Sequence, residues 1–207
     1  MKLVKLLTLC VFAFILLPSC AKIFYSPDAS KLAKNQKLIA IIPPKVSIAA
    51  SKKIDGEALK EQQKTESVNF QEEMYSWMLK RKMQGKIEPE IQDVETTNAK
   101  LKKAMYPDTP LTTAEICDVL GVDGIITSNF SLSKPMSEGT AIAIALVFGA
   151  YGSTNEVHVS LSINDCPNKK LIWNYDHKFS GSMGSSPARL VDGLMRAASK
   201  KMPYIIQ

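Results

Sequence analysis

The chain has 207 residues, of which 45% are hydrophobic and 22% are charged, a composition typical of a globular protein and not of a disordered one. Four cysteines are too few for a small protein held together by disulfide bonds, and no apolar run reaches the roughly 18 residues that a membrane-spanning helix needs. The formal net charge is +6, but few aromatic residues lie near the lysines, so we expect no nucleic-acid partner.

The N-terminus has the parts of an exported, lipid-modified protein. Lys2 and Lys5 form a basic start that precedes an apolar run, residues 6–17, which has the length of the hydrophobic part of a signal peptide. The run ends in Leu-Pro-Ser-Cys at 17–20, which resembles the lipobox of bacterial lipoproteins. The resemblance implies that the chain is cut before Cys20 and that a diacylglyceryl group is joined to the Cys20 thiol. An ordinary secretory signal cut by another peptidase is the alternative.

This resemblance divides the chain into a signal peptide, residues 1–19, and a mature protein that begins at Cys20. Each buried acyl methylene contributes roughly 0.8 kcal/mol, so two acyl chains or more would anchor the protein stably to a membrane. Ala21 stands where an aspartate often retains lipoproteins at the inner membrane, and no acidic export tract follows. The expected location is therefore the bacterial cell envelope, at the outer membrane and facing the periplasm.

Residues 20–37 are predicted to form a lipidated basic stalk. The stretch 22–64 contains nine lysines and four acidic residues, which gives it a charge of +5. Lysines beside a lipid anchor are attracted to anionic headgroups by about 1 kcal/mol per charge. A solvated linker that the lysines merely keep soluble is the alternative.

The next segments alternate between strands and helices. The apolar pentamer 38–42 is predicted to be a central strand, because both of its faces are apolar. Apolar residues repeat with helical spacing over 65–83. Residues 87–94 alternate as in a strand, which Pro89 places at a sheet edge, and 97–105 form a short helix.

A well-defined helix is predicted between Thr112 and Gly121. Thr112 and Glu115 have the spacing of a capping box, and Gly121 suits the left-handed residue that ends a helix. Residues 122–132 then form a second buried strand.

The last part of the chain is predicted to be a hairpin and a helix. Residues 155–163 and 171–179 alternate between apolar and polar side chains, and a turn at 166–169 joins them. Ser186 and Pro187 then have the types expected at a helix start. The order β-α-β-α-α-β-β-β-α predicts one α/β domain over residues 38–207, a mixed sheet of about five strands covered by helices.

An uncharged, mainly aliphatic stretch at 139–152 is too short to span a bilayer as a helix. It is expected to be a buried part of the core, a segment that dips into the membrane or contacts another subunit, or an exposed loop prone to aggregation. Its small residues permit close packing, which favours a packed or oligomeric role. The candidate membrane or oligomer contacts are Ile142, Ile144, Leu146, Val147 and Phe148.

Several of these features together resemble a known class of proteins. They are the lipobox, the strand Ile-Ala-Ile-Ile-Pro-Pro at 39–44, the sequence Leu-Gly-Val-Asp-Gly-Ile-Ile at 120–126 and a hairpin that contains Trp173. This pattern is similar to envelope lipoproteins whose α/β domain is like the TolB N-terminal domain and the curli-secretion (CsgG-like) lipoproteins. The resemblance implies a scaffold, assembly factor or secretion component. Pore formation is not implied, because 139–152 is too uniformly apolar for an amphipathic barrel hairpin.

Catalytic motifs are absent from the sequence. His158 and His177 are the only histidines, and neither lies in a metal-binding pattern. No nucleophile elbow, phosphate-binding loop or dinucleotide-binding pattern occurs. We therefore expect no enzyme activity, no catalytic residue, no cofactor and no metal. Cys117 and Cys166 are candidates for a disulfide in an oxidising periplasm.

The sequence predicts a non-catalytic, membrane-anchored lipoprotein that acts as a scaffold, assembly or secretion-accessory factor. Its expected partners are the membrane, through Cys20, other envelope proteins, and a second copy of itself through 139–152. A carrier of lipid or a small ligand, with 139–152 as a pocket wall, is the alternative. A hydrolase of cell-wall glycan would need two carboxylates within about 10 Å, and no such pair is evident.

Overall fold

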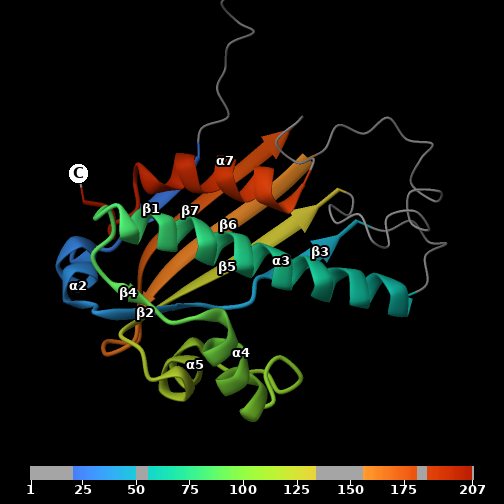
Figure 1. Ribbon diagram of the computed structural model, residues 1–207, viewed down its shortest axis with the longest axis horizontal. Helices are drawn as coiled ribbons and strands as arrows, with labels where there is room; N and C mark the ends of the chain where they lie inside the picture. Colours follow the sequence, from blue (N-terminus) through green and yellow to red (C-terminus); the bar gives the residue numbers. More distant parts are fainter. Residues whose placement is uncertain (1–20, 50–55, 134–155, 181–185, 207) are drawn as a thin grey trace, which may run out of the picture.

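The computed structural model describes residues 21–49, 56–133, 156–180 and 186–206 (Figure 1). Cys20, the rest of the lipobox and the stretch 139–152 with its five candidate contact residues lie outside the described residues. The elements run, in chain order, β1 (Lys22–Tyr25), α2 (Ala29–Asn35), β2 (Leu38–Ile41), β3 (Lys45–Ile48), α3 (Gly56–Met83), β4 (Glu90–Ile91), α4 (Val94–Lys103), α5 (Thr113–Leu120), β5 (Gly124–Leu132), β6 (Glu156–Asp165), β7 (Lys170–Ser180) and α7 (Pro187–Ser199).

The strands form one mixed sheet of seven, in the order β1-β7-β6-β5-β2-β4, with β3 paired to β5 beyond the end of β2. The pairs β1–β7, β7–β6 and β6–β5 are antiparallel, whereas the pairs β5–β2, β5–β3 and β2–β4 are parallel. The predicted α/β class is therefore confirmed as a single mixed sheet covered by helices.

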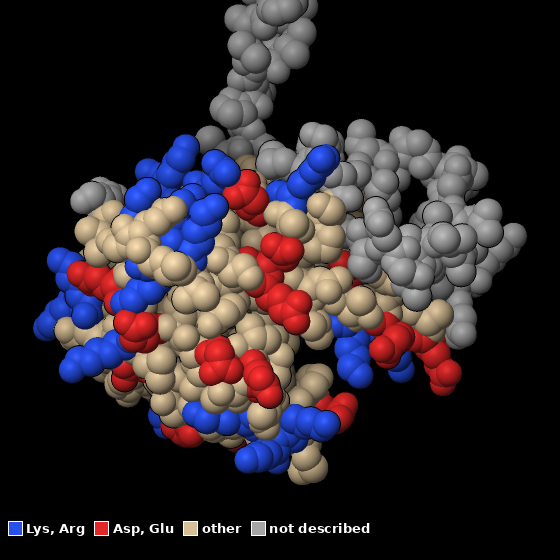
Figure 2. All heavy atoms as spheres, in the orientation of Figure 1, with Lys and Arg blue, Asp and Glu red and all other residues tan. Residues whose placement is uncertain are grey.

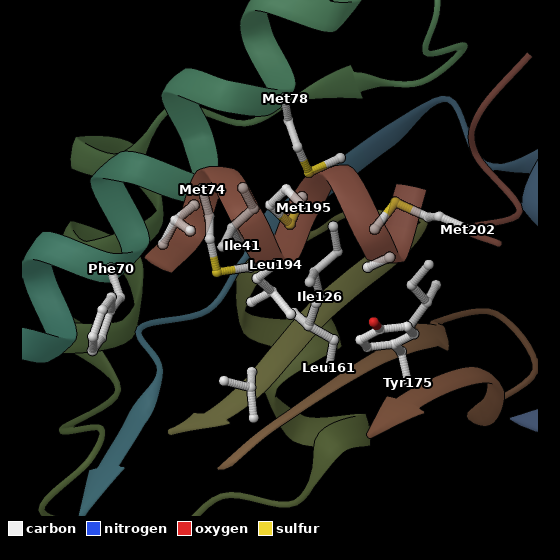
Figure 3. Packing of buried hydrophobic residues seen from close by; sticks show 14 of the residues in the cluster. Ile41, Phe70, Met74, Met78, Ile126, Leu161, Tyr175, Leu194, Met195 and Met202 are labelled. Atoms are coloured by element: carbon white, nitrogen blue, oxygen red, sulfur yellow. The ribbon is translucent and has the colours of Figure 1, made fainter. Parts of the chain in front are cut away.

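The helices form two unequal layers. α3 and α7 lie side by side across one face of the sheet, while α4 and α5 lie on the opposite face beside β2 (Figure 1). The main core forms where the apolar stripes of α3 and α7 meet the inward-facing positions of β2, β5, β6 and β7 (Figure 3). Met74, Ile126, Leu161 and Leu194 are fully buried there. A second apolar cluster lies under α4 and α5.

The prediction of a basic stalk at 20–37 is wrong for the described residues, because β1 and α2 belong to the folded domain. β1 pairs with β7, with Lys22 opposite Asp176, and α2 buries Ala29 and Ala33 against the core. The domain therefore begins at residue 22 and not at residue 38. The lysines of 22–37 are consequently carried by folded elements and do not form a linker.

Two further strands differ from the prediction. β3 follows Pro43 and Pro44, where no strand is predicted. The edge strand expected over 87–94 is reduced to β4, which has two residues. In each case the pairing partner lies far away in the sequence, so local alternation is a weak guide.

An ion pair joins the N-terminal elements to β7. Both carboxylate oxygens of Asp28 accept hydrogen bonds from Lys170 Nζ, at 2.7 and 2.8 Å, and Ser26 Oγ donates a third at 2.7 Å. The hydrogen bond from Lys170, followed by that from Ser26, lowers the pKa of Asp28 from 3.8 to about 2.

The pKa of Asp28 should respond to Lys170. A carboxylate with a lower pKa in the folded than in the unfolded state stabilises the fold above the unfolded value of 3.8, and this contribution is lost as the pH falls from there to about 2. In Lys170→Met, NMR titration of the Asp28 carboxyl should give a pKa closer to 3.8. The same pKa in both proteins would contradict the assignment.

Candidate functional site

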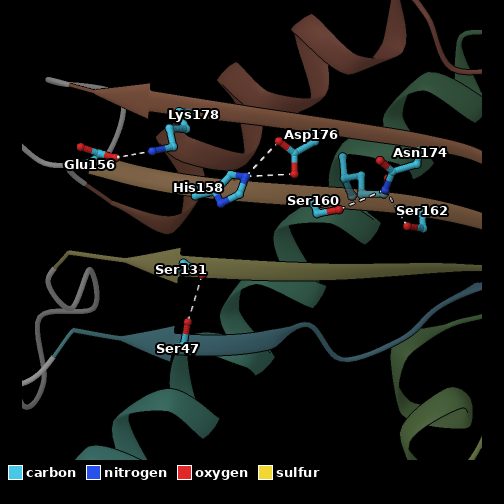
Figure 4. Close-up of polar contacts among 10 residues, drawn as sticks. Ser47, Ser131, Glu156, His158, Ser160, Ser162, Asn174, Asp176 and Lys178 are labelled. Atoms are coloured by element: carbon cyan, nitrogen blue, oxygen red, sulfur yellow. Dashed lines mark hydrogen bonds and ion pairs between the residues drawn. The ribbon is translucent and has the colours of Figure 1, made fainter. Parts of the chain in front are cut away.

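The outer face of the β5-β6-β7 sheet is a polar surface that α3 and α7 do not cover (Figure 4). Alternation along each strand places apolar side chains toward these two helices and polar side chains on the outer face. We call this surface the polar sheet face. Its members are Thr127, Asn129, Ser131, Glu156, His158, Ser160, Ser162, Asn174, Asp176 and Lys178.

Asn174 is the centre of one hydrogen-bond cluster on the polar sheet face. Its Nδ2 donates to Ser160 Oγ at 3.0 Å, to Ser162 Oγ at 2.9 Å and to the Leu161 carbonyl at 3.1 Å. Cross-strand pairing explains this geometry, because Ser162 lies directly opposite Asn174. The amide thereby fixes the positions of two hydroxyl groups on the surface.

Charged groups on the same face are paired with each other. His158 Nε2 lies 2.9 and 3.0 Å from the two Asp176 oxygens, and Lys178 Nζ lies 3.3 Å from Glu156 Oε1. The His158 and Asp176 side chains keep 42% and 34% of their surface exposed. The face therefore offers balanced charges and hydroxyl groups, and it has no large net charge of either sign.

These groups are not arranged as a nucleophile and its base. The Ser160 hydroxyl accepts from Asn174, and among the described contacts none joins His158 to a serine. The described part of the chain also contains no group of three or more His, Cys, Asp or Glu residues that could hold a metal ion. The chemistry that this face supports is hydrogen bonding to another surface.

His177 has a different environment, although it lies on the same strand. It points to the core side between Tyr175 and Phe179, with ring centroids 5.9 and 4.4 Å away. Burial lowers the pKa of His177, and the nearby Asp176 charge opposes this shift. His177 is thus a packing residue.

Cys117 and Cys166 are joined by a disulfide, with Cα atoms 5.5 Å apart. Cys117 lies in α5 and Cys166 in the turn between β6 and β7, and both side chains are buried in the second apolar cluster. The bond therefore ties α5 to the hairpin.

The Leu-Gly-Val-Asp-Gly sequence has a structural role. Gly121 ends α5 in the left-handed conformation, with φ of 62°. The Asp123 carboxylate accepts the backbone N–H groups of Lys37 and Leu38, at 2.8 and 2.9 Å, and so caps the start of β2.

A buried polar network beside this sequence was not predicted. Gln36 Nε2 donates to Asp165 Oδ1 at 2.8 Å, and the Tyr204 hydroxyl donates to Gln36 Oε1. Burial, with the Asp165 and Asp123 charges, raises the pKa of Tyr204 well above 10. The three residues come from three distant parts of the chain, and no local pattern marks them.

No helix of the described chain combines the length and the hydropathy needed to cross a membrane. No protein-family model and no curated protein sequence matches the chain. Solved structures with a similar arrangement include the PelC dodecamer from Paraburkholderia phytofirmans, at 9% identity and a TM-score of 0.41 over 91% of this chain and 99% of that one. The lipoprotein GNA1162 from Neisseria meningitidis has 12% identity and a TM-score of 0.45 over 80% of this chain and 96% of that one.

The LpoB C-terminal domain from Salmonella enterica has 12% identity and a TM-score of 0.35 over 74% of this chain and 93% of that one. The similar structures thus include a bacterial lipoprotein. The finer resemblance to the TolB and CsgG-like class stays a prediction. Similarity at this level transfers no activity or partner to this chain.

Proposed function

We propose that the protein is a non-catalytic lipoprotein of the bacterial envelope that is anchored through Cys20 and holds other envelope proteins at the membrane. The observation that carries this proposal is the short distance between the lipobox and the fold. Lys22, the first residue of β1, follows Cys20 by two positions. Two residues span at most about 7 Å, so a lipidated Cys20 would keep β1 close to the membrane surface.

The strand directions say which end of the sheet the anchor would approach. β1 is antiparallel to β7, so the chain enters β1 from the side on which β7 ends. β5 and β3 end on that side, and β6 begins there. Ser133 and Glu156, the described residues on either side of 134–155, are hydrogen-bonded to each other at this end of the sheet. The chain that contains 139–152 is therefore connected to the sheet on the side of the proposed anchor. This supports our proposal that its apolar residues contact the membrane or a second copy.

Partner contact is assigned to the polar sheet face. Its paired charges and ordered hydroxyl groups suit a protein surface, whereas a polyanion would require an excess of cations. A location at the outer membrane, facing the periplasm, is part of the proposal and rests on the lipobox and on Ala21.

Replacement of Cys20 tests the anchor. Wild-type protein should incorporate labelled palmitate and sediment with membranes, and Cys20→Ala should lose both properties by at least about tenfold, because the acyl chains supply the membrane affinity. Cys10→Ala is a matched control within the signal peptide and should behave as wild type. Normal processing in cells treated with globomycin, or palmitate incorporation into Cys20→Ala, would rule out the anchor.

In-cell crosslinking with the anchor intact tests the docking role. The double variant Ser160→Arg/Ser162→Arg places bulky cations on the polar sheet face and should remove specific crosslinked species. Ser30→Arg, at an exposed position of α2, is the control and should leave them unchanged. If both variants retain the same crosslinks, the polar sheet face is not the docking surface.

A further inference from the structure

A groove of about 750 Å³ lies between α3, α4 and the connection from β2 to β3, away from the polar sheet face. Its fourth side is the loop 106–111, which follows α4. Figure 2 shows the surface hollowed below α3 and beside α4. The volume lies within the range of sites that enclose most of a small ligand or a short peptide.

The walls of the groove are apolar and rigid. Pro43 and Pro44 form one side and Pro107 and Pro110 the other, and proline rings fix the backbone φ angle at each position. Ser67 Oγ in α3 donates to the Pro44 carbonyl at 2.6 Å, which holds the first wall against the helix. A preformed site of this kind loses little conformational entropy on binding.

The charged groups around the groove are mostly cations. Lys45, Lys64 and Lys102 line it, together with a single carboxylate, Asp108. All three lysines are exposed, and none has an ion-pair partner within the described ranges. The half-buried Tyr106 adds a hydroxyl donor, whose pKa is raised by burial. The groove thus combines apolar walls with free donors and an excess of positive charge.

We propose that this groove binds a short extended peptide segment of a partner protein, one that carries apolar side chains and at least one carboxylate. The carboxylate would meet the ammonium groups of Lys45, Lys64 and Lys102, while the apolar side chains would contact the proline walls and the exposed Val68. The groove is open to solvent along one side, where a peptide can expose its polar backbone but an acyl chain would remain wetted. This inference rests on the proposed docking function and names the chemistry of one partner contact.

Peptide binding by the full chain in detergent tests the inference. The probes are two series of capped peptides, about six residues long, built from Leu, Val and Pro with either Glu or Gln at matched positions. The Glu series should bind at least about tenfold more tightly than the Gln series, and Lys64→Glu/Lys102→Glu should lose that preference. Lys60→Glu/Lys103→Glu changes the net charge equally at exposed positions of the same helices, outside the groove lining, and should bind as wild type.

Besides a failure of peptide binding, three outcomes would overturn the inference. The first is equal binding of the two peptide series, and the second is an equal loss of binding in both double variants. The third is that sodium laurate displaces the Glu peptides at a lower concentration than unlabelled competitor peptides do. The last outcome would assign the groove to an anionic amphiphile. Failure of peptide binding, with the crosslinks of the polar sheet face still present, would reject the groove and leave the docking function intact.

Discussion

Replacing Gly124 with alanine should destabilise the domain by about 3 kcal/mol or more, a large effect for the addition of one methyl group. A Cβ atom at this position would lie 2.1 Å from Gln36 Oε1 and 2.9 Å from the Tyr204 hydroxyl oxygen. Gln36 is buried, and its side chain is held by hydrogen bonds to both Asp165 and Tyr204. The side chain cannot move aside without breaking a buried hydrogen bond, and each such loss costs about 1–3 kcal/mol.

Urea unfolding of the full chain in detergent measures this effect. Gly56→Ala is the control, because a Cβ atom there meets nothing within 4 Å and alanine favours the start of α3. Gly56→Ala should be neutral or slightly stabilising. If Gly124→Ala has the same midpoint as wild type, the steric argument is wrong.

A double-variant cycle shows whether Gln36 is the cause. Gln36→Ala removes the atoms nearest to the added methyl group, so in the Gly124→Ala background it should cost much less than in wild type. Additive effects of the two changes would place the strain elsewhere.

The longer elements could be predicted because their signals are local. The capping box at Thr112 is confirmed in both directions: the Thr112 side chain accepts from the Glu115 N–H, and Glu115 accepts from the Thr112 N–H. Ser186 caps α7, with Pro187 in its first turn, as predicted. The two alternating stretches pair as β6 and β7 over almost their whole length. Each signal lies within a few residues of sequence, where a pattern can be read directly.

The short elements and the sites depend on partners that are distant in the sequence. β1 exists because Lys22 to Tyr25 meet the edge of β7, about 150 residues later. The Gln36 network joins residues 129 and 168 positions apart. The groove is assembled from four separate segments, 43–46, 63–68, 98–102 and 106–111, and no local pattern marks them as one site. These residues come together only when the chain folds, so no local periodicity in the sequence predicts the network or the groove.

The same dependence explains the error in the N-terminal region. A lysine-rich stretch of about 16 residues resembles a linker in composition, yet a few apolar positions are enough to fold it once a core is available. Ile23 and Leu32 pack against the main core, while their lysine neighbours stay exposed. We therefore predict that a lipidated Cys20 holds the domain against the membrane without a spacer. Such close contact would limit which surfaces of the domain a membrane-bound partner can reach.

Loss of the disulfide between Cys117 and Cys166 should lower the free energy of unfolding by about 2–4 kcal/mol. The bond joins residues 49 positions apart, and the loss of loop entropy in the unfolded chain gives an upper value of about 4 kcal/mol at 25 °C. Both cysteines lie in the second apolar cluster beside Leu120, so alanine keeps the site apolar and the comparison measures mainly the cross-link. The measurement is urea unfolding of wild type and Cys117→Ala/Cys166→Ala, each with and without reductant.

Reductant should destabilise the wild type and leave the double variant unchanged. The result also bears on location, because structural disulfides persist in exported proteins and are rare in the cytosol. Protein extracted from cells under alkylating, non-reducing conditions should therefore show both thiols blocked from labelling. Two free thiols in that extract, or equal stability of the wild type with and without reductant, would contradict the cross-link, whatever the result at Cys20.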